Sequence, residues 1–109
     1  MRPPKKILVA PFEYDVALEP TLASIGEASG GCDPDRTRIV VDALLSESAK
    51  KDTILHETLH ALIHQTDLAR RLKEFDKDLE EDLVFALTPR LFALLLENPE
   101  LVEYLVGGS

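Results

Sequence analysis

The stretch TILHETLHALIH, residues 53–64, places three histidines and one glutamate in an otherwise apolar run. Such runs normally become protein core, which has little use for so many imidazoles. His56 and His60 are four residues apart, so a helix would hold them on one face with Cβ atoms about 5–6 Å apart. At that spacing two imidazole nitrogens can reach one zinc ion, each at about 2.0–2.1 Å.

Glu57 completes the pattern His-Glu-x-x-His. It projects about 100° round the helix from His56, which keeps its carboxylate off the metal but beside a water bound to it. On a helix this pattern supplies two zinc ligands and a general base. The alternative is a pair of core histidines bonded to backbone or carboxylates. Without a metal, however, two buried imidazoles and a carboxylate are costly to satisfy.

A catalytic zinc also needs a third protein ligand and an open position for water. His64 lies eight residues after His56, about 12 Å along an unbroken helix. The longer zinc-protease motif has a glycine three residues after its second histidine and another histidine three further on. Here those positions hold Ile63 and Thr66, which excludes that motif. His64 is therefore expected to be a half-exposed helix residue or a group that supports a ligand.

The remaining ligand candidates are carboxylates of the sequence LEEDL, residues 79–83. Glu80 shares a helical stripe with Val84 and Leu87, where a lone carboxylate would be costly to bury. A metal would remove that cost, so we predict Glu80 as the third ligand. Glu81 flanks the stripe and is the alternative. The competing interpretation is a solvated acidic helix start, which the helix dipole favours.

The elements that must position these residues begin with strands. Residues 7–18 are rich in strand formers, and Pro11 would place such a strand at a sheet edge or give it a bulge. A hairpin is expected next, with strands near 24–28 and 37–41. Glycine, aspartate and proline between 30 and 35 supply the turn chemistry.

Helical periodicity begins at Ser46 or Ser48 and continues to about Gln65. The predicted apolar stripe of this helix comprises Leu55, Leu59, Leu62 and Ile63. A solvated connection is expected between Asp67 and Lys77, followed by a second helix to about residue 87.

Two dipeptides that end in proline predict helix boundaries in the C-terminal part of the chain. Thr88-Pro89 and Asn98-Pro99 each resemble an N-cap followed by proline at the first helical position. We therefore expect a kink or restart at residue 89 and a short last helix that ends before Gly107. Because strands precede helices, the chain is predicted to be an α+β domain, with a small antiparallel or mixed N-terminal sheet.

Composition narrows the function classes. The 109 residues predict a single domain, and the net charge of −8, with scattered basic residues, argues against nucleic acid as a partner. The single cysteine, Cys32, cannot form an intrachain disulfide and is expected in a turn. No apolar stretch has the length of a secretion signal or a membrane span, so we predict a cytoplasmic protein without a membrane partner.

Together these residues resemble the zincin metallopeptidases, specifically the gluzincin type with a His, His, Glu ligand set. The small bacterial and phage-encoded proteins related to the ImmA/IrrE family are similar in TILHETLHAL (53–62) and in LEEDLVFALTPRLFALLLENPEL (79–101). The resemblance implies a minimal zincin-like domain that binds Zn²⁺ through His56, His60 and Glu80, or Glu81, with Glu57 as the base. It also implies an extended peptide along a sheet edge, for which the strand near 24–28 is our candidate.

The main hypothesis is therefore a zinc-dependent peptidase that acts on a peptide or protein through a metal-activated water. Tyr14, His64 and Tyr104 are the candidate donors to the transition state. The second hypothesis is a non-catalytic interaction protein with a zincin fold stabilised by zinc. The third is a metal-free helical scaffold. The apolar C-terminal stretch, residues 90–106, would either close the core or serve a dimer.

Overall fold

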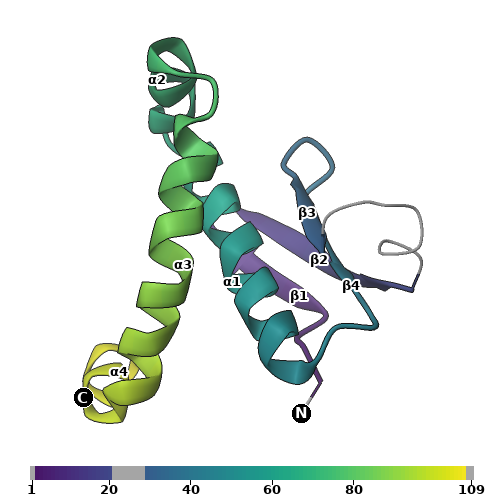
Figure 1. The fold of residues 1–109 in the computed structure, drawn as a ribbon, viewed down its shortest axis with the longest axis vertical. Helices are drawn as coiled ribbons and strands as arrows, with labels where there is room; N and C mark the ends of the chain where they lie inside the picture. Colours follow the sequence, from purple (N-terminus) through teal and green to yellow (C-terminus); the bar gives the residue numbers. More distant parts are fainter. Residues whose placement is uncertain (1, 21–28, 108–109) are drawn as a thin grey trace.

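A computed structural model describes residues 2–20 and 29–107 of the chain. The sheet contains β1 (Lys6–Val9), β2 (Phe12–Glu19), β3 (Gly30–Asp33) and β4 (Arg38–Asp42), in the order β1-β2-β4-β3. The central strands β2 and β4 are parallel, whereas both outer pairs are antiparallel. A mixed sheet followed by helices confirms the predicted α+β class (Figure 1).

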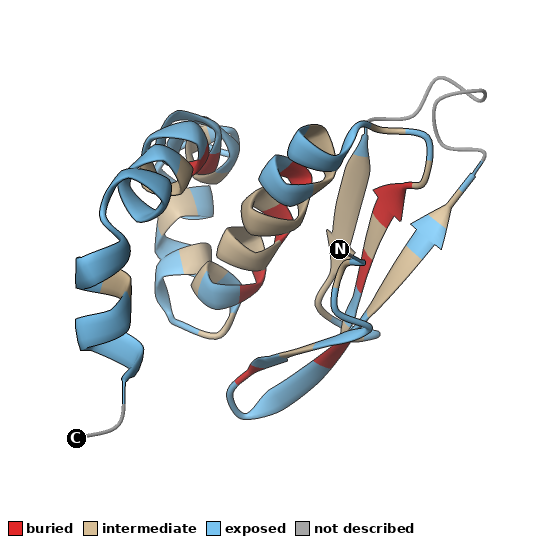
Figure 2. Ribbon diagram, turned by 90° about the horizontal axis from the view of Figure 1, so that it is seen from below, coloured by how far each residue is buried: buried red, intermediate tan, exposed pale blue. Residues whose placement is uncertain are grey.

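Four helices follow the sheet: α1 (Glu47–His64), α2 (Leu68–Phe75), α3 (Leu79–Glu97) and α4 (Pro99–Val106). Helix α1 lies between the sheet and α3, while α2 and α4 lie at opposite ends of α3 (Figures 1 and 2). Among the described residues, no helix combines the length and apolarity needed to cross a membrane.

The strand predictions were partly wrong. Residues 7–18 do not form one strand but fold back as β1 and β2, with Pro11 in the turn and Val9 opposite Phe12. The turn predicted at 30–35 starts too early, because Gly30–Asp33 forms β3 and pairs with β4. Cys32 is therefore a strand residue rather than a turn residue. The strand predicted near 24–28 lies outside the described residues.

Helix α1 begins as predicted, because the Ser46 hydroxyl accepts a hydrogen bond from the Ala49 amide at 3.2 Å. The predicted leucine stripe was wrong: the buried residues of α1 are Thr53, Glu57 and Ala61, while Leu62 is 49% exposed. Close approach of the helix to β3 explains this. A Cβ at Gly30 would lie only 2.6 Å from the Thr53 methyl carbon, which leaves little room for larger side chains in this layer.

The helical region after α1 also differs from the prediction. The expected connection at 67–77 contains helix α2, although its charged residues are exposed as expected. Thr88 does not cap a new helix: it is buried inside α3, and its hydroxyl donates to the Val84 carbonyl at 2.7 Å. Proline at 89 removes the hydrogen bond to the Phe85 carbonyl on an exposed face, where water can replace it, so α3 continues to Glu97.

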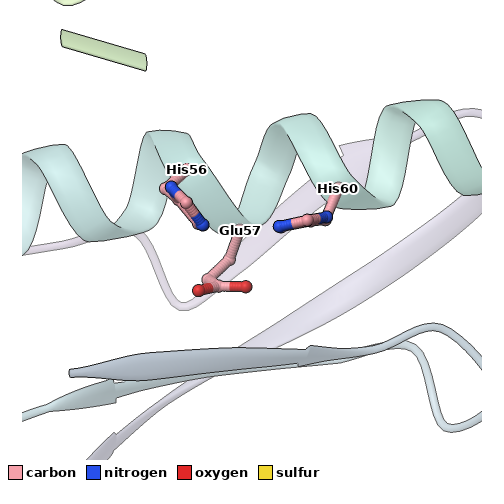
Figure 3. Close-up of side chains that lie close together, drawn as sticks. All are labelled: His56, Glu57 and His60. Atoms are coloured by element: carbon pink, nitrogen blue, oxygen red, sulfur yellow. The ribbon is translucent and has the colours of Figure 1, made fainter. Parts of the chain in front are cut away.

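The hydrophobic core is small and lies between the sheet and α1. It is formed by the buried side chains Val9, Tyr14, Ile39, Val41 and Ala61. Helix α3 contributes buried Val84 on the far side of α1. The one buried row of α1, Thr53, Glu57 and Ala61, faces the sheet, and the two histidines lie beside it (Figure 3).

Candidate metal centre

His56 and His60 project from the same side of α1, and their ring centroids are 5.0 Å apart (Figure 3). The side chains are 17% and 14% exposed, so both rings remain reachable from solvent. Glu57 extends from α1 between them toward the sheet. One potential ligand atom from each of the three residues lies within 4.8 Å of the other two. The predicted helical pattern therefore forms a compact cluster.

Helix α3 brings two carboxylates to this cluster. The Glu81 oxygens lie 2.9 Å from His56 Nε2 and 2.8 Å from His60 Nε2, so one carboxylate contacts both rings. A Glu80 oxygen lies 2.6 Å from His60 Nδ1. Both glutamates singled out in the sequence thus reach the histidines, but they contact different nitrogens.

The protonation of His60 bears on what this arrangement can hold. A neutral imidazole has a single N–H and cannot donate to carboxylates at both of its nitrogens. His60 contacts Glu80 through Nδ1 and Glu81 through Nε2. If Nδ1–H donates to Glu80, the Nε2 lone pair is left free to bind a cation.

The donor types suit a zinc ion, which binds imidazole and carboxylate ligands. In a tetrahedral site with bonds of about 2.0–2.1 Å, neighbouring donor atoms lie about 3.3 Å apart. The distances from the Glu81 oxygens to the two Nε2 atoms, 2.9 and 2.8 Å, are within roughly half an ångström of that separation. Three carboxylates also surround two imidazoles, a surplus of negative charge that a divalent cation would offset in large part. His56, Glu57 and His60 offer ligand atoms close enough to hold one ion. The contacts of Glu81 with both Nε2 atoms make it a further candidate ligand.

Glu57 has a different environment from the other two glutamates. It is 8% exposed, and burial raises the pKa of its carboxyl, an effect that the neighbouring His56 and His60 oppose. On the sheet side it faces β3, where a Cβ at Gly30 would lie 3.7 Å from Glu57 Cγ. By contrast, Glu81 is 60% exposed. A carboxyl with a raised pKa that faces two potential ligands is suited to proton transfer.

The cluster opens into a cleft of about 680 Å³ between β3, α1 and α3. Besides the cluster residues and His64, its walls are formed by Ser29, Gly30, Gly31, Cys32, Pro34, Asp52, Thr53, Phe85, Thr88 and Pro89. Burial, together with the charge of Glu57, raises the pKa of the Cys32 thiol to about 12. The thiol is therefore protonated at neutral pH and is a poor nucleophile.

A second cleft of about 610 Å³ lies next to the first, and His60, His64, Glu80 and Glu81 border both. Its other residues are Thr66, Ala69, Arg70, Lys73 and Lys77. Arg70 is engaged by Asp67 and Glu74 at 2.9 Å. In the described part of the chain, no ion pair engages Lys73 or Lys77. One side of the cluster is thus basic.

Sequence reasoning located the histidines and glutamates but not the walls of the clefts. Gly30 and Cys32 were assigned to a turn, although two glycines within a strand are themselves a signal of close backbone approach. Among the proposed donors only His64 lines the clefts. Tyr14 is buried in the core, where its hydroxyl accepts from Gln65 at 3.0 Å, and Tyr104 on α4 is 83% exposed.

Comparison of the chain with protein-family models, curated proteins and solved structures finds no match.

Proposed function

We propose that this protein is a zinc-dependent peptidase with a minimal zincin-like fold. The observation that carries the proposal is the convergence of Glu81 on both Nε2 atoms beside the buried carboxylate of Glu57. In this assignment His56, His60 and Glu81 hold the ion. Glu80, the ligand first predicted from the sequence, instead orients His60 by accepting from Nδ1–H.

The chemistry divides between the ion and Glu57. Zinc, when bound, would polarise the peptide carbonyl and lower the pKa of a water to about 7. Glu57 accepts the proton of the attacking water and passes it to the leaving amine, a role typically worth about 10²–10⁴-fold in rate. Its raised pKa suits both halves of that exchange, because the carboxyl must release the proton as well as accept it.

A peptide substrate would bind along β3. Among the described strands this one is an edge of the sheet, since β4 pairs with it on one side only, and it forms one wall of the cleft. An extended peptide can add to such an edge through main-chain hydrogen bonds. Strand β3 thus takes the place of the strand expected near 24–28.

A second candidate function is a zinc-stabilised interaction protein without catalysis. It is favoured by the position of the cluster, because the contacts of Glu80 and Glu81 with the histidines join α3 to α1. An ion bound there would hold the two helices together whether or not a peptide is cleaved.

Glu57→Gln in the zinc-loaded protein separates the two functions. We expect loss of peptide cleavage with zinc content unchanged, measured by mass spectrometry of a peptide library and by metal analysis. Asp52→Asn is the matched control, because Asp52 also lines the cleft but is exposed. Equal cleavage by both variants would exclude Glu57 as the base. A zinc-loaded native protein that cleaves no member of the library would favour the interaction protein.

A further inference from the structure

The C-terminal end of the helical layer carries apolar side chains that no other part of the described chain covers. We define the apolar tip as Leu94, Leu95 and Leu96 of α3 with Leu101, Tyr104, Leu105 and Val106 of α4. Their exposed fractions range from 38% to 83%, and none of the residues of α4, Pro99–Val106, is buried. Figure 2 shows α4 apart from the sheet and almost entirely exposed. A helix of only two turns is marginal in water without such packing.

The apolar tip is a group of side chains and not a set of scattered surface leucines. Its seven residues lie together at one end of the helical layer, on α4 and the adjoining end of α3 (Figure 1). Monomeric proteins usually expose large apolar side chains singly, so such a group indicates an interaction surface.

The charges around the tip are all of one sign. Glu97, Glu100 and Glu103 lie among its apolar residues, and the sequence contains no lysine or arginine after Arg90. A complementary surface should therefore combine an apolar floor with a basic rim.

The same chain carries such a surface. We define the N-terminal groove as the cavity of about 330 Å³ between residues 2–7 and the β1 side of α1. Its floor includes Ile7, Ile54 and Leu55, and its rim carries Arg2, Lys50 and Lys51 against the single acidic Glu47. Lys50 lies 3.9 Å from Glu47, and within the described residues neither Arg2 nor Lys51 has an ion-pair partner.

The tip cannot fill the groove of its own chain. Helix α3 packs against the side of α1 that bears the histidines, whereas the groove lies on the side nearer β1. Since α3 is continuous from Leu79 to Glu97, carrying the tip round α1 would separate α3 from α1 and open the metal cluster. A second molecule can present the tip without that loss.

We propose that this protein self-associates, with the apolar tip of one copy docked in the N-terminal groove of another. The proposal does not depend on the peptidase assignment, because both surfaces lie away from the clefts. Reciprocal contacts would close a dimer, and a single contact repeated would give longer assemblies.

Charge-reversal variants test the proposal, with self-association measured by sedimentation or light scattering over a concentration series. We expect Glu100→Lys with Glu103→Lys, and separately Arg2→Glu with Lys51→Glu, each to weaken self-association about tenfold or more, since like charges then face each other. Combining all four changes should restore it. Asp35→Lys, on the exposed β3–β4 turn, is the control for a charge reversal away from both surfaces, and circular dichroism checks that each variant folds.

Three results would overturn the proposal. One is a native protein that remains monomeric across the series. Another is self-association that the tip changes weaken and the groove changes leave intact, which would indicate contact between two tips. The last is failure of the four combined changes to restore association in a folded protein.

Discussion

At the scale of single residues, two adjacent glutamates have separate tasks in the proposed site. Glu81 contacts both Nε2 atoms and would be a ligand, while Glu80 contacts only Nδ1 of His60. Loss of a carboxylate that orients a ligand typically costs about 10–100-fold in metal affinity. We therefore expect Glu80→Gln to weaken zinc binding by that amount and Glu81→Gln to weaken it further, as measured by competition with a chromophoric chelator.

Asp82→Asn is the control, because it removes the same charge from the same helix turn at an exposed position. Its zinc affinity should match that of the native protein. If Glu80→Gln caused the larger loss instead, Glu80 would be the ligand, as the stripe with Val84 and Leu87 first predicted.

Cys32 offers a pH test that does not depend on the peptidase assignment. With a pKa of about 12, the native thiol has a thiolate fraction near 10⁻⁴ at pH 8, against about 10⁻¹ to 1 for an ordinary cysteine. The reaction with a disulfide reagent should therefore be about 10³-fold slower in the metal-free native protein than in denaturant. Because the pKa is raised, the native rate should still rise about tenfold per unit up to pH 11, whereas the denatured rate levels off above pH 9. A native rate that levels off at the same pH as the denatured rate would contradict the raised pKa.

The residues of the cluster could be predicted from the sequence, but their geometry could not. His56, Glu57 and His60 are set by spacing within one helix, so local periodicity suffices to bring them together. Whether Glu80 or Glu81 meets the Nε2 atoms depends on how α3 is rotated against α1. That rotation is a property of packing between helices and has no local signal.

At the scale of elements, the errors share a physical cause. The leucine stripe on α1 was expected on the assumption that the largest apolar side chains face the sheet. Instead, the absence of a side chain at Gly30 of β3 lets α1 lie close to the sheet. The residues of α1 that face the sheet are therefore Thr53, Glu57 and Ala61 and not the leucines. Helix α2 was not predicted because its many charged residues obscure the helical spacing of its apolar residues. None of its residues is buried in the structure.

Helix α2 nevertheless shapes the proposed specificity. Lys73 of α2 and the following Lys77 line the basic cleft next to His60. If the protein cleaves peptides, substrates with an acidic residue on that side of the scissile bond should be preferred. Exposed ion pairs are worth up to about 1 kcal/mol each. Lys73→Glu with Lys77→Glu should therefore lower kcat/KM for an acidic peptide by roughly 3–10-fold and leave a neutral peptide unaffected.

The control for this prediction is Lys5→Glu, a charge reversal at an exposed position of the N-terminal segment. It should change neither rate. An equal loss on the acidic and the neutral peptide would indicate damage to the site rather than loss of a charge preference.

At the scale of the whole molecule, the order of strands and helices was sufficient to predict the α+β class. The mixed topology was not predictable, since the parallel pairing of β2 with β4 depends on contacts distant in sequence. The C-terminal stretch was left open between core and dimer, and the structure shows that the tip does not close the core of its own chain. Composition could not distinguish these outcomes, because an apolar helix suits either.

Zinc binding can be tested through the stability of the whole molecule. Because the hydrophobic core is small, a bound ion should contribute a large share of that stability. If zinc binds only the folded protein, a zinc concentration 100 times the Kd raises the free energy of unfolding by about 2.7 kcal/mol. For a chain of this length each kcal/mol shifts Tm by roughly 4–8 °C, so chelation should lower Tm by about 10–20 °C. The shift should vanish in a folded His56→Ala variant, which lacks a ligand, and should not be produced by magnesium, which requires oxygen ligands. A native Tm that is the same with zinc and with chelator would mean that the cluster binds no zinc ion.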